Sequence, residues 1–120
     1  MTKTGGPPED DATRALRTLL HELETCTAEL EQARTRAEAL LAARASGRAW
    51  LEVVSHEERP LIVERISTVL GTLSTAGHSW RREQAAALQA EDVSINRIAA
   101  LFGVTRQRIS ALLRETTDPA

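Results

Sequence analysis

Five residues near the C-terminus carry side chains that can read the edges of DNA bases. Arg106 can donate two hydrogen bonds to guanine O6 and N7, and Gln107 can bond to adenine N6 and N7. Ala111 can contact a thymine methyl group, and Ser110 can reach a base or a phosphate. Thr105 immediately precedes Arg106 and is the fifth candidate for a contact with a base. These residues act together only if the N-terminal part of one helix presents them to the major groove.

A second group of residues suits contacts with phosphate, which fix the register of a protein on DNA without carrying sequence information. Residues 78–114 hold six Arg against three acidic residues, in a chain whose formal net charge is −2. The clustering favours an interface over scattered surface charge. The predicted phosphate contacts are Arg81, Arg82, Ser94, Arg97, Arg108 and Arg114.

Two short helices joined by a tight turn are needed to present these residues. The stretch from Ser94 to Arg114 has the spacing of such a helix-turn-helix, with an ordinary helical hairpin as the alternative. Gly103 follows the first helix, where a left-handed backbone is expected, and Ser94 and Thr105 are placed to cap the two helices. The apolar residues expected in the shared core are Ile98, Ala99, Phe102, Val104, Ile109, Leu112 and Leu113.

The segment Ile98-Ala-Ala-Leu-Phe-Gly-Val-Thr-Arg-Gln-Arg-Ile-Ser-Ala-Leu-Leu113, with Arg81-Arg-Glu-Gln-Ala-Ala-Ala-Leu88 before it, resembles a known DNA-binding unit. It looks like the sigma-factor-like helix-turn-helix of small actinobacterial regulators and, more distantly, the DNA-binding end of resolvases. The resemblance covers roughly the last third of the chain. It implies a trihelical unit, DNA binding by the helix Thr105–Arg114, and no enzymatic activity.

The first half of the chain predicts a long helix from Asp11 to Ser46, which follows a disordered tail over residues 1–10 and ends at Gly47. Its apolar residues recur at alternating steps of three and four, which is the a/d pattern of a coiled coil. We therefore expect this helix to pair two copies of the chain. The expected dimerisation residues are Leu16, Leu19, Leu23, Cys26, Leu30, Ala33, Ala37 and Leu40.

The direction of that pairing stays open. A parallel dimer would place Glu29 opposite Arg34 of a second copy, which is an attractive pair. Antiparallel pairing is not excluded by one charge pair. An intramolecular bundle with residues 48–76 is the alternative to a dimer.

Connector and packing helices are expected over residues 47–77. They comprise a short helix at 49–54 and a helix from Pro60 to Ala76, with Gly77 at its end and Ser55 in a capping box before it. The DNA-binding unit then spans residues 78–115. Its supporting helix is expected from Ser79 to Ala90, and residues 116–120 form a flexible C-terminus. Trp50 and Trp80 are interpreted as core anchors, although Trp80 can also pack against a DNA backbone.

The composition favours helices packed on helices. Hydrophobic residues make up 42% of the 120 residues, but aromatic residues, which sheets favour, make up only 2%. We expect an all-α protein, with a long N-terminal coiled-coil helix and then a small helical bundle that ends in a trihelical helix-turn-helix. Lys3 is the one Lys among 15 basic residues, and this preference for Arg is typical of bacteria with GC-rich genomes.

Other classes of protein are not expected. No apolar run is long enough to cross a membrane and no signal-peptide pattern is present, which favours a cytoplasmic, nucleoid-associated protein. The three His residues and the single Cys lack metal-ligand spacing, and a redox role for Cys26 is left open. No nucleotide-binding loop or catalytic cluster is visible. We therefore expect no cofactor, no metal site and no enzymatic activity.

These features predict a transcriptional regulator that binds double-stranded DNA sequence-specifically as a homodimer, with Thr105–Arg114 in the major groove. Two alternatives are kept. A nucleoid-associated protein would use the same fold with little sequence preference. An interaction adaptor would use its coiled coil to hold a protein partner such as another regulator.

Overall fold

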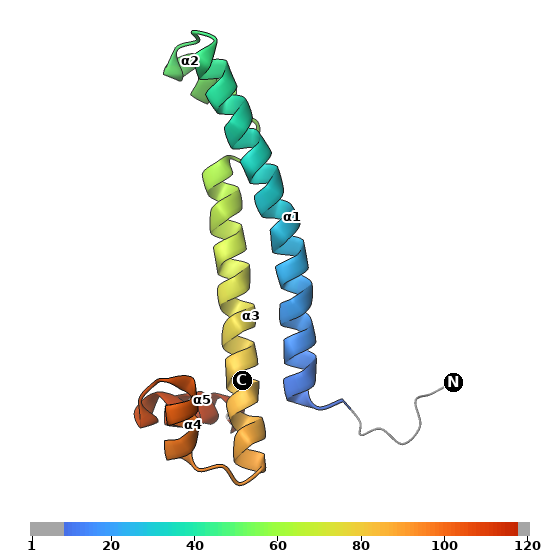
Figure 1. The fold of residues 1–120 in the computed structure, drawn as a ribbon, viewed down its shortest axis with the longest axis vertical. Helices are drawn as coiled ribbons and strands as arrows, with labels where there is room; N and C mark the ends of the chain where they lie inside the picture. Colours follow the sequence, from blue (N-terminus) through green and yellow to red (C-terminus); the bar gives the residue numbers. More distant parts are fainter. Residues whose placement is uncertain (1–8, 118–120) are drawn as a thin grey trace, which may run out of the picture. The chain divides into compact units, whose positions relative to one another are not determined.

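The computed structural model describes residues 9–117, all of whose regular structure is helical (Figure 1). The long N-terminal helix and the all-α class are thereby confirmed. The expected tail and flexible C-terminus fall largely outside the described residues, which exclude 1–8 and 118–120. The five helices are α1 (Asp11–Ala45), α2 (Trp50–Ser55), α3 (Ile62–Ala90), α4 (Ile95–Phe102) and α5 (Arg106–Thr117).

The described chain divides into two compact units. The hairpin unit is His21–Thr75, and the terminal unit contains the described residues up to Leu20 and from Ala76 onward. Helices α1 and α3 each contribute one part to each unit. The hairpin unit therefore contains most of the predicted dimerisation helix, and the terminal unit contains all of the predicted DNA contacts.

Local capping explains both ends of α1. Asp10 accepts a hydrogen bond from the backbone N–H of Thr13 at 2.8 Å, so this helix is capped from within the segment expected to be a tail. Hydrogen bonds from Thr13 lower the pKa of Asp10. At the other end, Gly47 has a φ of +101°, as expected for a glycine that ends a helix.

In the hairpin unit, α1 and α3 lie side by side and are joined by polar contacts (Figure 1). The Arg65 guanidinium donates to a Glu29 carboxylate oxygen and to Gln32 Oε1, the latter at 3.1 Å. Arg36 donates to the backbone carbonyl oxygens of Glu58 and Pro60, at 2.9 and 3.2 Å. These bonds fix the connector against α1. The side chains buried in this unit are Cys26, Ala33, Val53 and Val69.

One continuous helix, α3, occupies the region where two separate helices were expected. The prediction that Gly77 ends one helix and Ser79 caps the next was wrong. A single Gly costs a helix about 1 kcal/mol relative to Ala but leaves its backbone bonds intact. Among the described glycines, only Gly47 and Gly103 have a positive φ. Gly77 therefore keeps a helical backbone, and burial of the neighbouring Ala76 helps to offset the cost.

The start of α3 also differs from the prediction. The helix begins at Ile62 instead of Pro60. The Glu57 carboxylate accepts a hydrogen bond from the backbone N–H of Ile62 at 2.8 Å. The Glu64 carboxylate accepts one from the backbone N–H of the residue before Ile62, also at 2.8 Å. Two carboxylates thus satisfy free N–H groups at this end. Ser55 is not the cap, because its hydroxyl donates to a carbonyl oxygen within α2.

The core of the terminal unit is formed where α3, α4 and α5 meet. Ile98 of α4 and Ile109 of α5 are fully buried, and Ala85 of α3 packs with them. Phe102 and Val104 are partly buried against the same cluster. The predicted core of this region is therefore confirmed. The buried members of the cluster are Ala85, Ile98, Ala99, Ile109, Leu112 and Leu113.

Candidate nucleic-acid interface

The connection between α4 and α5 has the local geometry that the sequence predicts. Ser94 caps α4 by accepting from the backbone N–H of Arg97 at 3.2 Å. Gly103 adopts the left-handed conformation, with φ +70° and ψ 34°. Thr105 then accepts from the backbone N–H of Arg108 at 3.1 Å, at the start of α5. Both helices therefore have a defined starting point, which fixes the side chains of α5 relative to α4.

The two sides of α5 differ sharply in exposure. Ile109, Leu112 and Leu113 are 0%, 3% and 7% exposed, which fixes that side of the helix against the core. At the N-terminal end, Arg106 and Gln107 are exposed. A helix whose inner side is packed in this way holds its outer side chains in a defined direction.

The candidate base-contacting residues gather on the outer side of α5. Arg106, Gln107, Ser110 and Arg114 line one shallow pocket of about 300 Å³. Thr105 is exposed, whereas Ser110 and Ala111 are half-buried. The fold thus brings Arg106 and Gln107 together with Ser110 as predicted. Ala111 is not among the residues that line this pocket.

The predicted phosphate contacts are in different environments. Arg97 and Arg108 are exposed, and Arg81 lies over the ring of Phe102 with its guanidinium carbon 4.7 Å from the centroid. Arg82 is held by acidic side chains inside the unit, with Glu83 at 3.6 Å and Glu115 at 3.8 Å. Its charge is therefore largely matched within the chain, which makes it the weakest candidate of the group.

A hydrogen bond that sequence reasoning missed ties the end of α5 to α3. His78 donates from Nε2 to a Glu115 carboxylate oxygen at 2.8 Å. This hydrogen bond lowers the pKa of Glu115, and the nearby Arg82 adds to the effect. The two partners are 37 residues apart, and no local pattern in the sequence links them.

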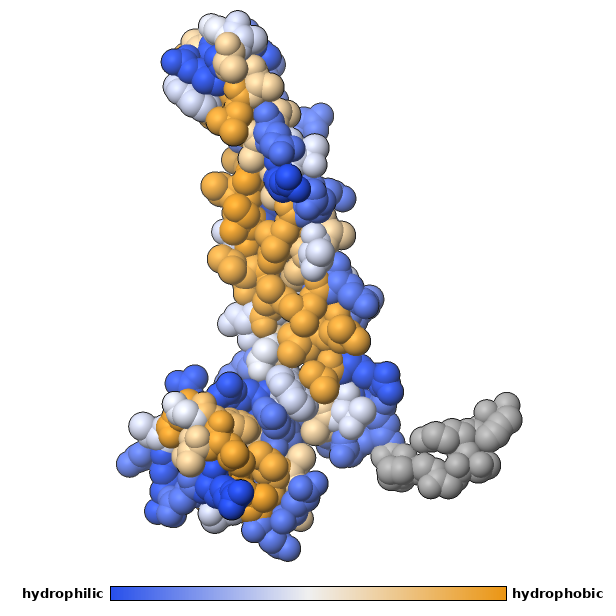
Figure 2. Space-filling view, in the orientation of Figure 1, coloured by the Kyte–Doolittle hydropathy of each residue, from blue (hydrophilic) through white to orange (hydrophobic). Residues whose placement is uncertain are grey.

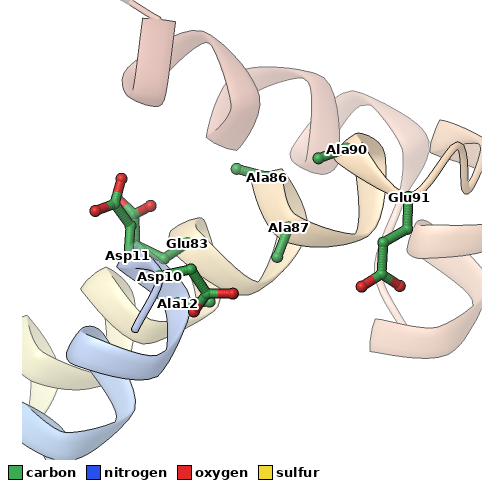
Figure 3. A pocket seen from close by; sticks show the side chains of 8 residues that line it. All are labelled: Asp10, Asp11, Ala12, Glu83, Ala86, Ala87, Ala90 and Glu91. Carbon is green, nitrogen blue, oxygen red and sulfur yellow. The ribbon is translucent and has the colours of Figure 1, made fainter. Parts of the chain in front are cut away.

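Acidic side chains line a pocket on another side of the terminal unit (Figure 3). The pocket has a volume of about 300 Å³, and its acidic residues are Asp10, Asp11, Glu83 and Glu91. Glu83, Ala87 and Ala90 recur at helical spacing on the face of α3 opposite the buried Ala85. This face of the terminal unit is therefore acidic, in contrast to the outer side of α5, where Arg106 and Arg114 line a pocket. Within residues 9–117, no three His, Cys, Asp or Glu side chains are grouped to hold a metal ion.

The predicted dimerisation residues divide into three sets. Cys26 and Ala33 are buried within the single chain, at 4% and 6% exposure. Leu16, Leu23 and Leu30 are 46%, 44% and 45% exposed. The remaining members of the predicted seam are half-buried, namely Leu19, Ala37 and Leu40. Only part of the heptad seam is therefore left for another chain.

The charged residues beside the seam are also engaged within the chain. Glu29, expected to face Arg34 of a second copy, is bonded to Arg65 instead. Arg34 pairs with Glu31 and Glu38 along its own helix, at 3.2 and 3.7 Å. Within the single chain, both members of the expected intermolecular pair therefore already have ion-pair partners. Glu29 finds its cation on α3, which lies against α1 in the hairpin unit.

Comparison of the chain with models of protein families, with curated proteins and with solved structures finds no match. In the part of the chain that the structure describes, no helix has the length and apolarity needed to cross a membrane.

Proposed function

We propose that this protein is a sequence-specific, DNA-binding transcriptional regulator that acts as a dimer. In this proposal α4 and α5 form a helix-turn-helix, and α5 enters the major groove with Arg106 and Gln107 as its main base contacts. The observation that carries the proposal is the polar outer side of α5, where four hydrogen-bonding side chains line one shallow pocket.

The local geometry of the two helices supports this assignment. A recognition helix reads bases mainly with its N-terminal residues, and Arg106 is the first residue of α5. The left-handed turn at Gly103 and the cap at Thr105 fix where that helix begins. The resemblance of residues 98–113 to sigma-factor-like helix-turn-helix units points to the same function.

The charge distribution supports the direction of approach. The exposed Arg97 and Arg108 lie in the segment that would face DNA, whereas the acidic pocket lies on another side of the unit. The chain as a whole has a net charge of −2, so its affinity for DNA has to come from this local basic surface. A dimer raises that affinity because the second recognition helix binds at high effective concentration.

Selection of bound sites from a random DNA pool tests the proposal. The expected result is an enriched motif with two related half-sites about one helical turn, or a multiple of it, apart. In a repeat with the Arg106→Ala variant, one base position in each half-site should lose its preference. The Arg48→Ala variant is the matched control, because it removes an exposed Arg from the hairpin unit and should leave the motif unchanged. Recovery of no motif despite tight binding would favour the nucleoid-associated alternative instead.

A further inference from the structure

We propose that a second copy of this chain docks on an apolar face shared by α1 and α3 in the hairpin unit. The dimer is then a four-helix bundle in which both helices contribute, instead of a two-stranded coiled coil of α1 alone. The inference rests on the proposed function only in taking the dimer as the DNA-binding form. Its evidence lies in the hairpin unit, whereas the proposed DNA contacts belong to the terminal unit.

Large apolar side chains form the proposed interface, which we call the hairpin face. Figure 2 shows apolar side chains gathered in a band along α1 and α3. In the hairpin unit the residues are Leu23, Leu30 and Leu41 of α1, and Val63, Ile66 and Leu70 of α3. Each is at least 38% exposed within the single chain. Water-exposed side chains of this kind along two adjacent helices indicate a missing packing partner.

The heptad spacing of α1 explains why this face is left over. Cys26 and Ala33 are seven residues apart and are buried, so they belong to the column that packs inside the chain. Leu23 and Leu30 are also seven residues apart, but they lie on the adjacent side of the helix. One apolar column therefore packs within the hairpin and the other stays exposed. A helix with two such columns suits a bundle of four, in which each helix contacts two neighbours.

Helix α3 repeats this arrangement. Val69 is buried at 3% exposure, while Val63 and Leu70, seven residues apart, are exposed at 66% and 62%. Both helices therefore carry an exposed apolar column, and the band of apolar surface in Figure 2 runs over both helices. A coiled coil of α1 alone would leave the α3 half of the band in water. A second hairpin covers both halves.

The exposed apolar area of the hairpin face approaches what one partner of a stable dimer buries. Six partly exposed side chains of this size present on the order of 600 Å², the upper end of the largest apolar patch on a typical monomer. Trp50, Leu51 and Val54 of α2 are 51%, 80% and 61% exposed. These α2 side chains lie outside the hairpin face, so the face by itself supplies about three quarters of the roughly 800 Å² that each partner buries in a standard interface.

The charge pattern favours a second copy as the occupant. Residues 66–77 of α3 contain no Asp, Glu, Lys, Arg or His, in a chain of which 27% is charged. A partner with a charged rim would find no opposite charge along this stretch, and its own charges would lose hydration without compensation. A second copy brings the same uncharged stretch to the interface. A self-complementary surface of this kind is what a two-fold dimer requires.

Sedimentation velocity on the full chain without DNA tests the proposal, with one Glu substitution on each helix of the face. The wild type should be a dimer at micromolar concentration. Leu30→Glu and Leu70→Glu should each raise the dimer dissociation constant at least tenfold, because each places a charge in the interface. The matched controls are Ala28→Glu and Thr75→Glu, which alter exposed positions outside the hairpin face and should leave the dimer intact.

Circular dichroism guards against a trivial loss of folding, because Leu30 and Leu70 are already exposed within the chain and their replacement should preserve helicity. The milder Leu30→Gln and Leu70→Gln variants should show a smaller shift in the same direction. A wild-type monomer would overturn the proposal. So would a dimer that withstands Leu70→Glu, since that result leaves α1 as the sole interface.

DNA binding measured on the same proteins separates the two proposals. Arg106→Ala should dimerise as the wild type does and lose preference for one base. A dimer that binds no DNA would refute the proposed function and leave the hairpin face standing. A monomer that binds DNA specifically would overturn the hairpin face and the dimeric part of the proposed function, and would leave only the assignment of α5 as the DNA-reading helix.

Discussion

The guanidinium group of Arg81 lies over the ring of Phe102, with its central carbon 4.7 Å from the ring centroid. The contact joins α3 to α4 in the terminal unit. A cation held over an aromatic face in this way gains about 0.5–1 kcal/mol at an exposed site. The side chain of Arg81 is therefore held beside α4 by this contact.

Replacement of Arg81 by Ala should weaken binding to specific and random DNA by about the same factor. A phosphate contact carries no sequence information, so its loss should also reduce the salt dependence of binding by about one released counterion. Titrations of both kinds of DNA at several salt concentrations measure these effects. Arg81→Lys keeps the charge but loses the planar stacking on the ring. Its affinity for DNA should therefore lie between those of the wild type and Arg81→Ala. A loss confined to the specific site would instead assign Arg81 to a base.

Gln107→Ala should weaken binding to the preferred DNA site only, in contrast to the uniform weakening expected for Arg81→Ala. Loss of a bidentate contact with a base costs about 1–3 kcal/mol for the preferred site, while affinity for random DNA should barely change. Competition binding against a panel of single-base site variants shows whether preference relaxes at one position only. Asn96→Ala is the matched control, since it removes an exposed side-chain amide from α4. Equal behaviour of the two variants would contradict the assignment of α5 as the recognition helix.

Two glycines should respond differently to the same substitution. Gly71 lies within α3 and a Cβ there would meet no atom within 4 Å, so Gly71→Ala should raise the free energy of unfolding by about 0.5–1 kcal/mol. Gly103 has a φ of +70° and also has open space around a Cβ. Gly103→Ala should nevertheless destabilise the protein, because an L-residue costs about 1–2 kcal/mol in that conformation. Urea denaturation followed by circular dichroism compares them. Equal effects would show that backbone conformation is not the deciding factor.

The hydrogen bond between His78 and Glu115 predicts a pH dependence. Because the pKa of Glu115 is lowered in the folded state, its stabilising contribution is present above the ordinary carboxyl pKa and is lost as pH falls through the lowered value. Glu115→Gln should therefore lower Tm near pH 7 and have little effect near pH 3. Thermal melts of both proteins across that range test the prediction. A Tm difference that is constant with pH would mean that ionisation of Glu115 is not involved.

Local sequence patterns determined the parts of the fold that depend on a few neighbouring residues. The caps at Ser94 and Thr105 and the left-handed turn at Gly103 were predicted correctly, because each is set by groups within three or four positions along the chain. The buried and exposed sides of α5 were also predictable. Three apolar residues at helical spacing define which side packs, and the polar candidates then lie on the other.

Only the tertiary structure decided which side of α1 packs within the chain. Leu23 and Cys26 belong to equally regular apolar columns, so periodicity alone assigned both to one dimer seam. The choice depends on α3, whose Arg65 reaches Glu29 across 36 residues of sequence. The continuity of α3 through Gly77 was likewise hidden, because a glycine weakens a helix without ending it. Contacts between distant segments settle such alternatives, and their free energies are absent from any local pattern.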